Sequence, residues 1–187
     1  MSGWVILAVL VGLALWGVGL YNGLVTMRQR AHQAFADIDV QLKQRHDLIP
    51  NLVETVKGYA AHEKDTLDAV IKARNSAMSA QGTAGQAQAE AGLSGALGRL
   101  IALSEAYPDL KANTNFQQLQ TELSDIENKL AAARRFFNNA VAEFNAGIES
   151  FPAVLLARQF GFQAMTLFDL GGDTRKTLDA APPQVKF

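Results

Sequence analysis

Three histidines are the residues of this sequence best suited to catalysis or metal binding, namely His32, His46 and His62. The segment HEKDT at 62–66 begins like the HExxH motif of zinc proteases, but Thr66 stands where that motif needs its second histidine. His32 and His46 would lie about 21 Å apart along a single helix, which is too far to share a metal ion. We therefore expect no metal site, and we assign the histidines structural or surface roles.

No other pattern in the sequence is typical of catalysis. The chain has no cysteine, which excludes disulfides, thiol nucleophiles and cysteine-ligated zinc. It also lacks a glycine-rich phosphate loop, a G-x-S-x-G nucleophile elbow and the Glu-x-x-His pairs of ferritin-like di-metal sites. We predict a protein that is not an enzyme and that uses no cofactor.

The stretch DIDVQLKQRHDLIPNL at 37–52 concentrates charged residues close behind an apolar N-terminus. Most of these charges flank a line of apolar residues at helical spacing, as on a solvated or ion-paired helix face. We take this stretch, with aromatic residues near the C-terminus, as the candidate interaction surface. Its members are Asp37, Asp39, Lys43, Arg45, Asp47, Phe160, Phe162 and Phe168.

Arg45 differs from its neighbours because it falls on the apolar line itself. A buried guanidinium needs an acidic partner from another helix, and Glu105, Glu127 and Glu143 are the candidates. Asparagines at helical spacing indicate either a polar layer between helices or a stripe that binds a partner. The candidate buried polar layer comprises Arg45, Glu105, Arg134, Asn138 and Asn145.

The overall charge of the chain is close to zero, with 17 lysines and arginines against 18 aspartates and glutamates. Such a balance gives no global field that would attract polyanions. We therefore expect no nucleic-acid partner.

The first element that must position these residues is an apolar run, WVILAVLVGLALWGVGL at 4–20. As a helix it would be about 25 Å long, and Leu24 and Val25 extend it towards the thickness of a bilayer. A cleaved signal peptide would need a basic start and small residues before the cleavage site, and the opening MSG offers neither. We predict an uncleaved transmembrane anchor at 1–25.

The flanks of this run predict its orientation. No basic side chain precedes the run, whereas Arg28, Arg30, Lys43 and Arg45 follow it. The positive-inside rule then puts the N-terminus outside and the rest of the chain in the cytoplasm. The expected location is a cytoplasmic membrane crossed once.

Most of the remaining chain has the apolar periodicity of long helices. Apolar residues recur in heptad-like steps of three and four along 31–77, 93–107 and 116–151. The first line passes Pro50 without a change of phase. Because proline removes the hydrogen bond to the carbonyl of His46, we expect a bent but continuous helix there rather than two helices.

Turn signals separate these helices. The Ala/Gly/Gln-rich segment at 79–92 predicts a loop with a weak helical tendency at its end. YPDLKANTN at 107–115 predicts a turn at which the helices either fold back or continue as one kinked arm. Thr114 and Gln117 have the spacing of a capping box for the third helix. Pro152 favours the end of that helix at the preceding residue.

The predicted fold is all-α, an N-terminal transmembrane helix followed by an antiparallel up-and-down bundle of three long helices and one short helix, with the bundle at 26–168. The short helix lies in the apolar segment at 151–170, interrupted near Gly161. Its aromatic residues would cover the bundle core, lie on lipid or contact a neighbouring protomer. The tail at 169–187 is expected to be extended or disordered, or to add as a strand to a partner.

Several stretches together resemble the LemA family across nearly the whole chain. They are YNGLV at 21–25, DIDVQLKQRHDLIPNLVETVKGYAAHE at 37–63, LIALSEAYPDLKANTNFQQLQTEL at 100–123, IENKLAAARRFFNNAVAEFN at 126–145 and FPAVLLARQFGF at 151–162. The resemblance implies a bacterial inner-membrane protein with one N-terminal anchor and a cytoplasmic antiparallel helical bundle, and it brings no known catalytic activity. It also suggests an adaptor of HtpX-type membrane metalloproteases.

The favoured function is that of a non-enzymatic, membrane-anchored scaffold or adaptor in membrane protein quality control that also self-associates. One alternative is a membrane-shaping or lipid-organising homo-oligomer. Another is an enzyme or sensor with a buried polar pocket around Arg45, His46, Glu105 and Arg134.

Overall fold

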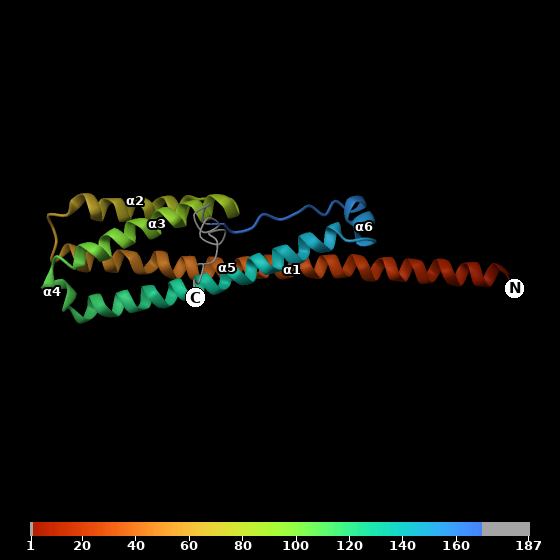
Figure 1. Cartoon of the computed structure of the whole chain (residues 1–187), viewed down its shortest axis with the longest axis horizontal. Coiled ribbons are helices and arrows are strands. Elements are labelled where there is room, and N and C mark those ends of the chain that lie inside the picture. Colours follow the sequence, from red (N-terminus) through yellow and green to blue (C-terminus); the bar gives the residue numbers. More distant parts are fainter. Residues whose placement is uncertain (1, 170–187) are drawn as a thin grey trace, which may run out of the picture. The chain divides into compact units, whose positions relative to one another are not determined.

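The computed structural model describes residues 2–169, and within that range it contains helices and connecting segments but no strand. The prediction of an all-α fold with a long apolar N-terminal helix is confirmed (Figure 1). The tail predicted at 169–187 lies outside the described residues except for Asp169. The helices are α1 Ser2–Lys57, α2 Lys64–Ser79, α3 Gly82–Ser104, α4 Pro108–Lys111, α5 Thr114–Glu149 and α6 Ala153–Gln159.

Helix α1 is continuous through Pro50, as its unbroken apolar line predicts. Proline cannot donate to the carbonyl of His46 four residues earlier. The guanidinium of Arg74, on α2, donates to that oxygen instead, from Nε at 2.7 Å. A neighbouring helix therefore replaces the hydrogen bond that the proline removes.

The prediction that the first helix continues to Ala77 is wrong. Helix α1 ends at Lys57, and the chain turns through 58–63 before α2 begins at Lys64. Gly58 is a poor helix former, and Tyr59 and Ala60 donate their amides to the same carbonyl, that of Val56. The apolar periodicity of the later residues belongs to a separate helix.

The loop predicted at 79–92 is also wrong, because most of it forms the first half of α3. Only Ala80 and Gln81 connect α2 to α3, and Gly82 takes a left-handed φ of 72° at the turn. The alanines and glutamines of this segment are good helix formers, and they outweigh its interior glycines. Ala87 and Glu90 are buried as part of the new helix.

The segment at 107–115 contains the short helix α4 between α3 and α5, with Pro108 at its first helical position. The expected capping box at Thr114 is replaced by Asn113, whose Oδ1 accepts the amide of Phe116 at 2.9 Å. This is the ordinary N-cap bond to the third helical residue. Helix α5 ends at Glu149, before Pro152 as predicted.

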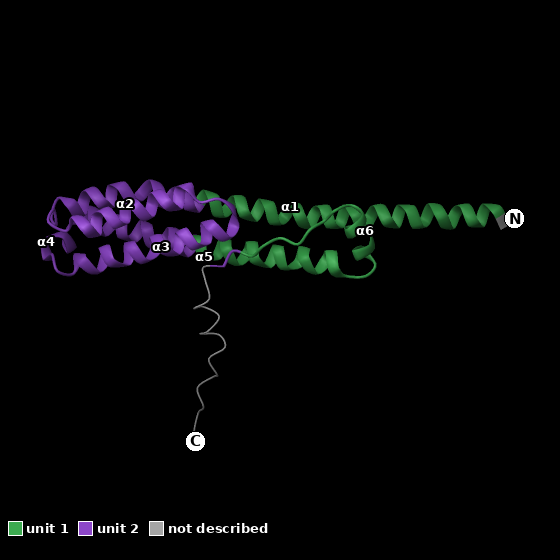
Figure 2. Ribbon diagram, turned by 90° about the horizontal axis from the view of Figure 1, so that it is seen from above, with its two compact units in different colours: residues 1–40, 130–167 green, residues 41–129, 168–187 purple. Residues whose placement is uncertain are grey.

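The described residues divide into two compact units, 2–40 with 130–167 and 41–129 with 168–169 (Figure 2). The second unit has the larger core, in which apolar residues of α1, α2, α3 and α5 meet. Its largest fully buried apolar side chains are Ile49, Leu52, Leu93, Leu97, Leu100, Leu110, Phe116 and Leu123.

In the first unit, α1 and α5 lie side by side, with α6 packed onto them. The core there joins Leu24, Phe144, Ile148 and Ala157. Gly147 allows the close approach, since a Cβ at this position would lie 3.0 Å from Met27 Sδ and 3.4 Å from Leu24 Cδ2. Within this unit, the apolar core therefore holds α6 against α1.

Candidate functional site

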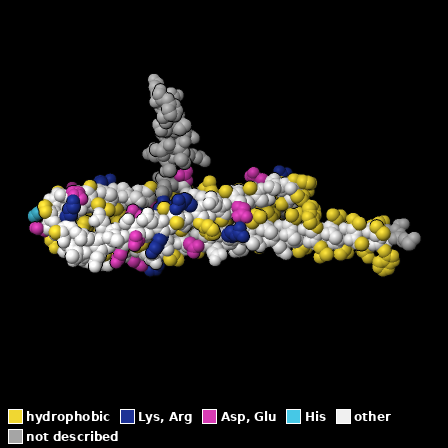
Figure 3. Space-filling model, turned by 60° about the horizontal axis from the view of Figure 1, so that its bottom comes forward, with side chains coloured by type: hydrophobic (Ala, Val, Ile, Leu, Met, Phe, Trp, Pro, Cys, Tyr) yellow, Lys and Arg dark blue, Asp and Glu magenta, His cyan; other side chains and the backbone are white. Residues whose placement is uncertain are grey.

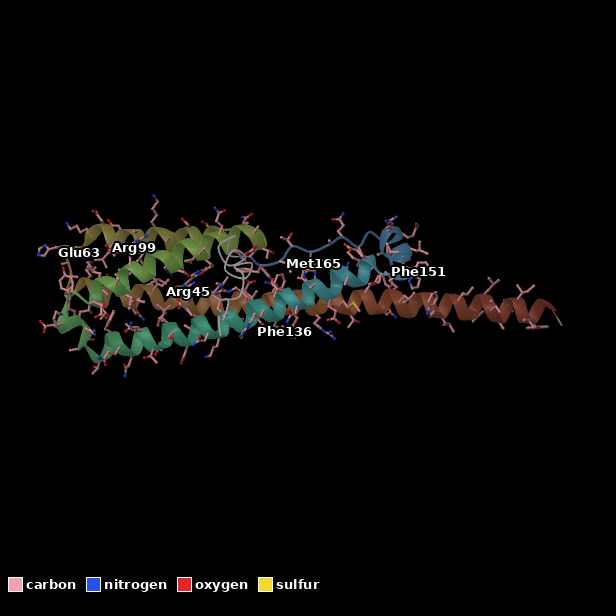
Figure 4. All side chains as sticks on the ribbon, in the orientation of Figure 1. Arg45, Glu63, Arg99, Phe136, Phe151 and Met165 are labelled. Carbon is pink, nitrogen blue, oxygen red and sulfur yellow. The ribbon has the colours of Figure 1, made fainter. Side chains whose placement is uncertain are left out.

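A buried ion cluster lies in the second unit, centred on Arg45 (Figure 4). The side chain of Arg45 is 1% exposed. Its Nη1 donates to Glu90 Oε2 at 2.9 Å. Its Nη2 donates to Ser94 Oγ at 2.8 Å and to Glu127 Oε1 at 2.9 Å. Two carboxylates thus share one buried guanidinium, which is the arrangement that a buried charge requires.

His46 completes this cluster from the adjacent position of α1. Its Nε2 lies 2.6 Å from Glu90 Oε1, so both carboxylate oxygens of Glu90 have partners. Glu90 is itself buried, and a buried charge is costly unless it is paired and hydrogen-bonded. Arg45 balances its charge, and Arg45 and His46 together supply its hydrogen bonds. A ligand could reach these groups only by breaking bonds that stabilise the fold.

The cluster corrects the predicted polar layer. Glu127 is the partner of Arg45 among the three acids considered. Glu143 pairs instead with Arg30 at 3.1 Å. Glu105 is exposed and pairs with Lys111, so its predicted burial is wrong. It sits at the C-terminal end of α3, where the helix turns towards α4 at the surface.

Glu90 escaped sequence reasoning because its segment, 79–92, was taken for a loop, whereas Ser94 lies in the line predicted as a helix and was not recognised as a partner of Arg45. Glu90 nevertheless lies three residues before Leu93 and seven before Leu97, on the buried face of α3. The alanines before Leu93 continue the same apolar line towards the N-terminus, and Glu90 falls on that line. A buried acid on one helix and the buried Arg45 on another would then have been expected to pair.

Asn145 also has a defined role, but in the first unit. Its Nδ2 donates to the carbonyl of Met165 at 2.9 Å, and its Oδ1 accepts the amide of Met165 at 2.8 Å. The two bonds fix the extended segment after Gly161 to α5. Arg134 and Asn138 are partly buried, on the same helix.

The charged part of the predicted interaction surface is exposed at Asp37, Asp39, Lys43 and Asp47. Lys43 donates to Asp47 Oδ2 at 2.7 Å, and this hydrogen bond, aided by nearby positive charges, lowers the pKa of Asp47 from its usual value. Arg45 does not belong to this surface because it is buried. The Lys43–Asp47 pair is an ordinary i,i+4 pair on a helix face.

The three aromatic residues of the predicted surface differ in their exposure. Phe160 is 59% exposed, and its ring meets the ring of Tyr21 edge-on at 4.9 Å. Phe162 is partly buried, between the rings of Tyr21 and Phe144. Phe168 is buried, so its predicted place on an exposed surface is wrong. Only the α6 end of this segment offers apolar surface to a partner.

The N-terminal part of α1 forms an exposed apolar surface (Figure 3). Its most apolar window of 18 residues has a mean hydropathy of 2.2, and none of that window is buried within the protein. By length and composition it is the one single helix among the described residues that could cross a membrane. The bent pair formed by α5 and α6 also passes that test when the two helices are taken together.

Comparison with known proteins gives one family model, described as the LemA family, which matches residues 34–187. The magnetosome protein MamQ of Magnetospirillum gryphiswaldense is 28% identical over 174 residues, covering 79% of this chain and 64% of the relative. Magnetosome protein MamQ 2 of Paramagnetospirillum magneticum is 26% identical, covering 82% of this chain and 67% of the relative. Protein LemA of Metamycoplasma hominis is 24% identical, covering 88% of this chain and 75% of the relative. The chain thus spans about two thirds of the length of the MamQ relatives.

Proposed function

Since the chain belongs to the LemA family, we propose that it is a non-enzymatic scaffold or adaptor that the N-terminal part of α1 anchors in the bacterial inner membrane. The remaining helices, on this proposal, present surfaces to a partner.

The observation that carries the proposal is the exposure of the apolar run in α1. Trp4, Leu7 and Leu15 have half or more of their surface uncovered, and the run contains no charge to keep it in water. Each square ångström of apolar surface removed from water contributes roughly 25 cal/mol, so a continuous helix of such side chains strongly favours a bilayer. A second protein surface would have to cover the whole circumference of the helix to do the same.

The proposed orientation places the packed helices in the cytoplasm. Arg28 and Arg30 follow the apolar run within about three turns, and the residues given before it, Met1 to Gly3, carry no basic side chain. Such a bias in short flanks favours retention of the basic side in the cytoplasm.

The proposed scaffold role is supported by the state of the charged residues in the second unit. Arg45 and Glu90 contact each other and their neighbours, and these contacts give them a structural task. In the first unit, Asp37 is exposed on a helix face that a partner can reach. An HtpX-type membrane metalloprotease is the partner that the family suggests, and self-association is the alternative.

Membrane anchoring is tested with the full-length protein expressed in bacteria and extracted with alkaline carbonate. Leu10→Arg puts a charge at the middle of the apolar run, where insertion of an arginine costs about 2.5–3.5 kcal/mol. We expect this variant to shift towards the soluble fraction. Val40→Arg is the matched control, because Val40 is also an exposed apolar residue of α1 but lies beyond the run. Equal extraction of the wild type and Leu10→Arg into the soluble fraction would refute the anchor.

The partner is tested by placing a photo-crosslinking amino acid at Asp37 or Asp39 and at Phe160, irradiating intact membranes and identifying the products by mass spectrometry. A membrane metalloprotease among the products supports the adaptor role. Crosslinks between copies of the chain alone would replace the adaptor by a self-assembling scaffold. A buried position such as Leu52 is the control for random crosslinking.

A further inference from the structure

Helix α6 and the bend before it form an apolar surface beside the part of α1 that would cross the membrane. Phe151 is 82% exposed and Leu155 is 63% exposed. A groove of about 440 Å³ lies between α6 and α1. Its walls include Leu13, Gly17 and Tyr21 of α1, Leu156 of α6 and Phe160 directly after α6. Every residue named in these walls is apolar, glycine or tyrosine.

From this geometry we propose that α6 is a second membrane contact, which inserts into the bilayer next to α1, and that an acyl chain of a bilayer lipid occupies the groove between them. The proposal rests on the proposed function, since it takes the N-terminal part of α1 as a membrane-spanning helix. It assigns the exposed aromatic residues on either side of α6, Phe151 and Phe160, to lipid rather than to a protein partner.

The depth of the groove supports lipid as the occupant. Leu13 and Tyr21 are eight residues apart, which corresponds to about 12 Å along the helix axis. This is a sizeable part of a hydrocarbon core about 30 Å thick. A wall that belongs to the spanning helix lies in the bilayer, and the facing wall, formed by Leu156 and Phe160, must lie at the same depth. The groove is therefore open to lipid rather than to water.

The direction of α6 agrees with this placement. In the first unit α5 runs beside α1, and α6 is bent by 94° from α5. If α1 crosses the bilayer, α6 lies close to the membrane plane. Amphipathic helices at membrane interfaces take this orientation, with apolar side chains directed into the acyl region.

Basic side chains are placed where lipid phosphates would be. The guanidinium of Arg28 lies 5.0 Å from the centre of the Phe162 ring, and Arg158 is exposed on α6 itself. Long arginine side chains at helix ends extend from the acyl region to the headgroups. Phe162 and Arg28 therefore mark the level at which the apolar surface gives way to the polar interface.

At both ends of α6, several backbone amides already have hydrogen-bond partners. This matters in an apolar environment, where each unpaired amide or carbonyl is costly. Val154 donates to the carbonyl of Ser150 at 2.8 Å, and Pro152 has no amide hydrogen to satisfy. At the other end, Phe160 donates to Leu156 and Phe162 donates to Ala157, both at 2.9 Å. Gly161, with φ of 70°, allows this closing turn.

The proposal is tested with single-cysteine variants of the full-length protein, which has no cysteine of its own. Cysteines at Phe151, Leu155 and Phe160 are labelled with the fluorophore NBD, and the protein is reconstituted into phosphatidylcholine–phosphatidylglycerol vesicles. Val9→Cys reports the spanning helix. Ile71→Cys is the matched control, because Ile71 is an exposed apolar residue of α2 in the second unit.

Two quenchers distinguish the outcomes, namely lipids that carry a nitroxide on the acyl chain and the aqueous reductant dithionite. We expect nitroxide quenching of the labels at Phe151, Leu155 and Phe160, and reduction by dithionite several-fold slower than at Ile71. Labels at these positions that behave like the Ile71 label, while the Val9 label is quenched by lipid, would overturn the second contact and leave the anchor intact. An unquenched label at Val9 would overturn the anchor and this inference together.

Discussion

Arg74 donates from Nε to the carbonyl oxygen of His46 at 2.7 Å, and that oxygen is the one that Pro50 leaves without its helical partner. A proline inside a helix removes one hydrogen bond of the backbone ladder. Here the side chain of α2 restores a bond at that point and, by doing so, also ties α2 to α1. The proline thus creates an acceptor by which a second helix is positioned.

This relationship predicts that the effects of changes at Arg74 and Pro50 are not additive. Arg74→Ala should lower the free energy of unfolding by about 1–3 kcal/mol, because a partly buried carbonyl loses a charged donor. In a Pro50→Ala background the restored amide can serve the same carbonyl, and the loss should shrink by about 1 kcal/mol. The measurement is urea unfolding of the full-length protein in detergent micelles, followed by far-UV circular dichroism.

Lys72→Ala is the control for this cycle, because Lys72 is an exposed basic residue on the same helix. It should change the unfolding free energy by no more than about 0.5 kcal/mol. Equal losses for Arg74→Ala with and without Pro50 would show that the bond to His46 does not depend on the proline.

The ion cluster predicts a large difference between two glutamates that both pair with a basic residue. Glu90→Ala leaves Arg45 without its most buried partner and should cost about 3–5 kcal/mol. Glu105→Ala removes an exposed pair with Lys111 and should cost less than about 1 kcal/mol. The same unfolding measurement compares them, and similar losses for the two variants would contradict the assignment of the cluster as a structural core.

Replacing Arg45 and Glu90 together distinguishes the effect of their packing from the effect of their charge pairing. The double variant Arg45→Met with Glu90→Leu removes both central charges of the cluster and keeps apolar volume. It should be less destabilised than Glu90→Ala alone, since no buried guanidinium is left unpaired. If the double variant is less stable than Glu90→Ala, the cluster stabilises the fold by more than the pairing of its two opposite charges.

Sequence reasoning found the helical fold because apolar spacing is set by which face of a helix is buried. It located α5 and the continuity through Pro50 well, since each depends on residues close in sequence. It missed the turn at 58–63, because an apolar line with the same phase resumes in α2. Periodicity records which residues are buried, and two helices that share a core can continue one pattern across a turn.

The site was predicted only in part for a related reason. Arg45 was identified as a charge on an apolar line, which is a local observation. Its partners depend on which helices pack together, and the assignment of 79–92 as a loop removed Glu90 from consideration. Likewise, the bond between Asn145 and Met165 joins a helix to an irregular segment whose path has no sequence period.

Two glycines of α3 should respond in opposite directions to alanine. Gly95 is helical, and nothing lies within 4 Å of an added Cβ, so Gly95→Ala should stabilise by about 0.5–1 kcal/mol through helix propensity. Gly82 has φ of 72°, where a side chain is strained, so Gly82→Ala should destabilise by about 1–2 kcal/mol. Thermal unfolding in detergent micelles gives both signs, and stabilisation at Gly82 would contradict the left-handed turn there.

Asp47 supplies a prediction about pH. The hydrogen bond from Lys43 is the largest cause of the lowered pKa of Asp47, so Lys43→Gln should move that pKa up towards the usual value. Because the folded-state pKa is the lower one, the contribution of this pair to stability is present above the unfolded-state pKa and is lost as the pH falls through the folded-state value. The pKa of Asp47 is measured from the carboxyl chemical shift in NMR spectra recorded against pH. Asp68→Asn identifies the signal of a second exposed carboxylate, on α2, so that the two are not confused.

Asn145 predicts how firmly the segment after α6 is attached. Asn145→Ala leaves both the amide and the carbonyl of Met165 without the partners that they have in the fold. We expect a loss of about 1–3 kcal/mol, or, if the segment detaches and is solvated, much faster amide hydrogen exchange confined to residues 161–169. Asn139→Ala, at an exposed position of the same helix, should leave both quantities unchanged.

The hydrogen-exchange result also bears on the membrane contact proposed for α6. If α6 inserts into lipid, vesicles should protect its amides in the Asn145→Ala protein even after residues 161–169 exchange freely, because the bilayer holds the helix independently of that clamp. Helix α6 would then be more strongly protected in vesicles than in a detergent that does not fill the groove. Loss of protection over α6 and residues 161–169 together, in vesicles, would show that lipid contributes nothing to the position of α6.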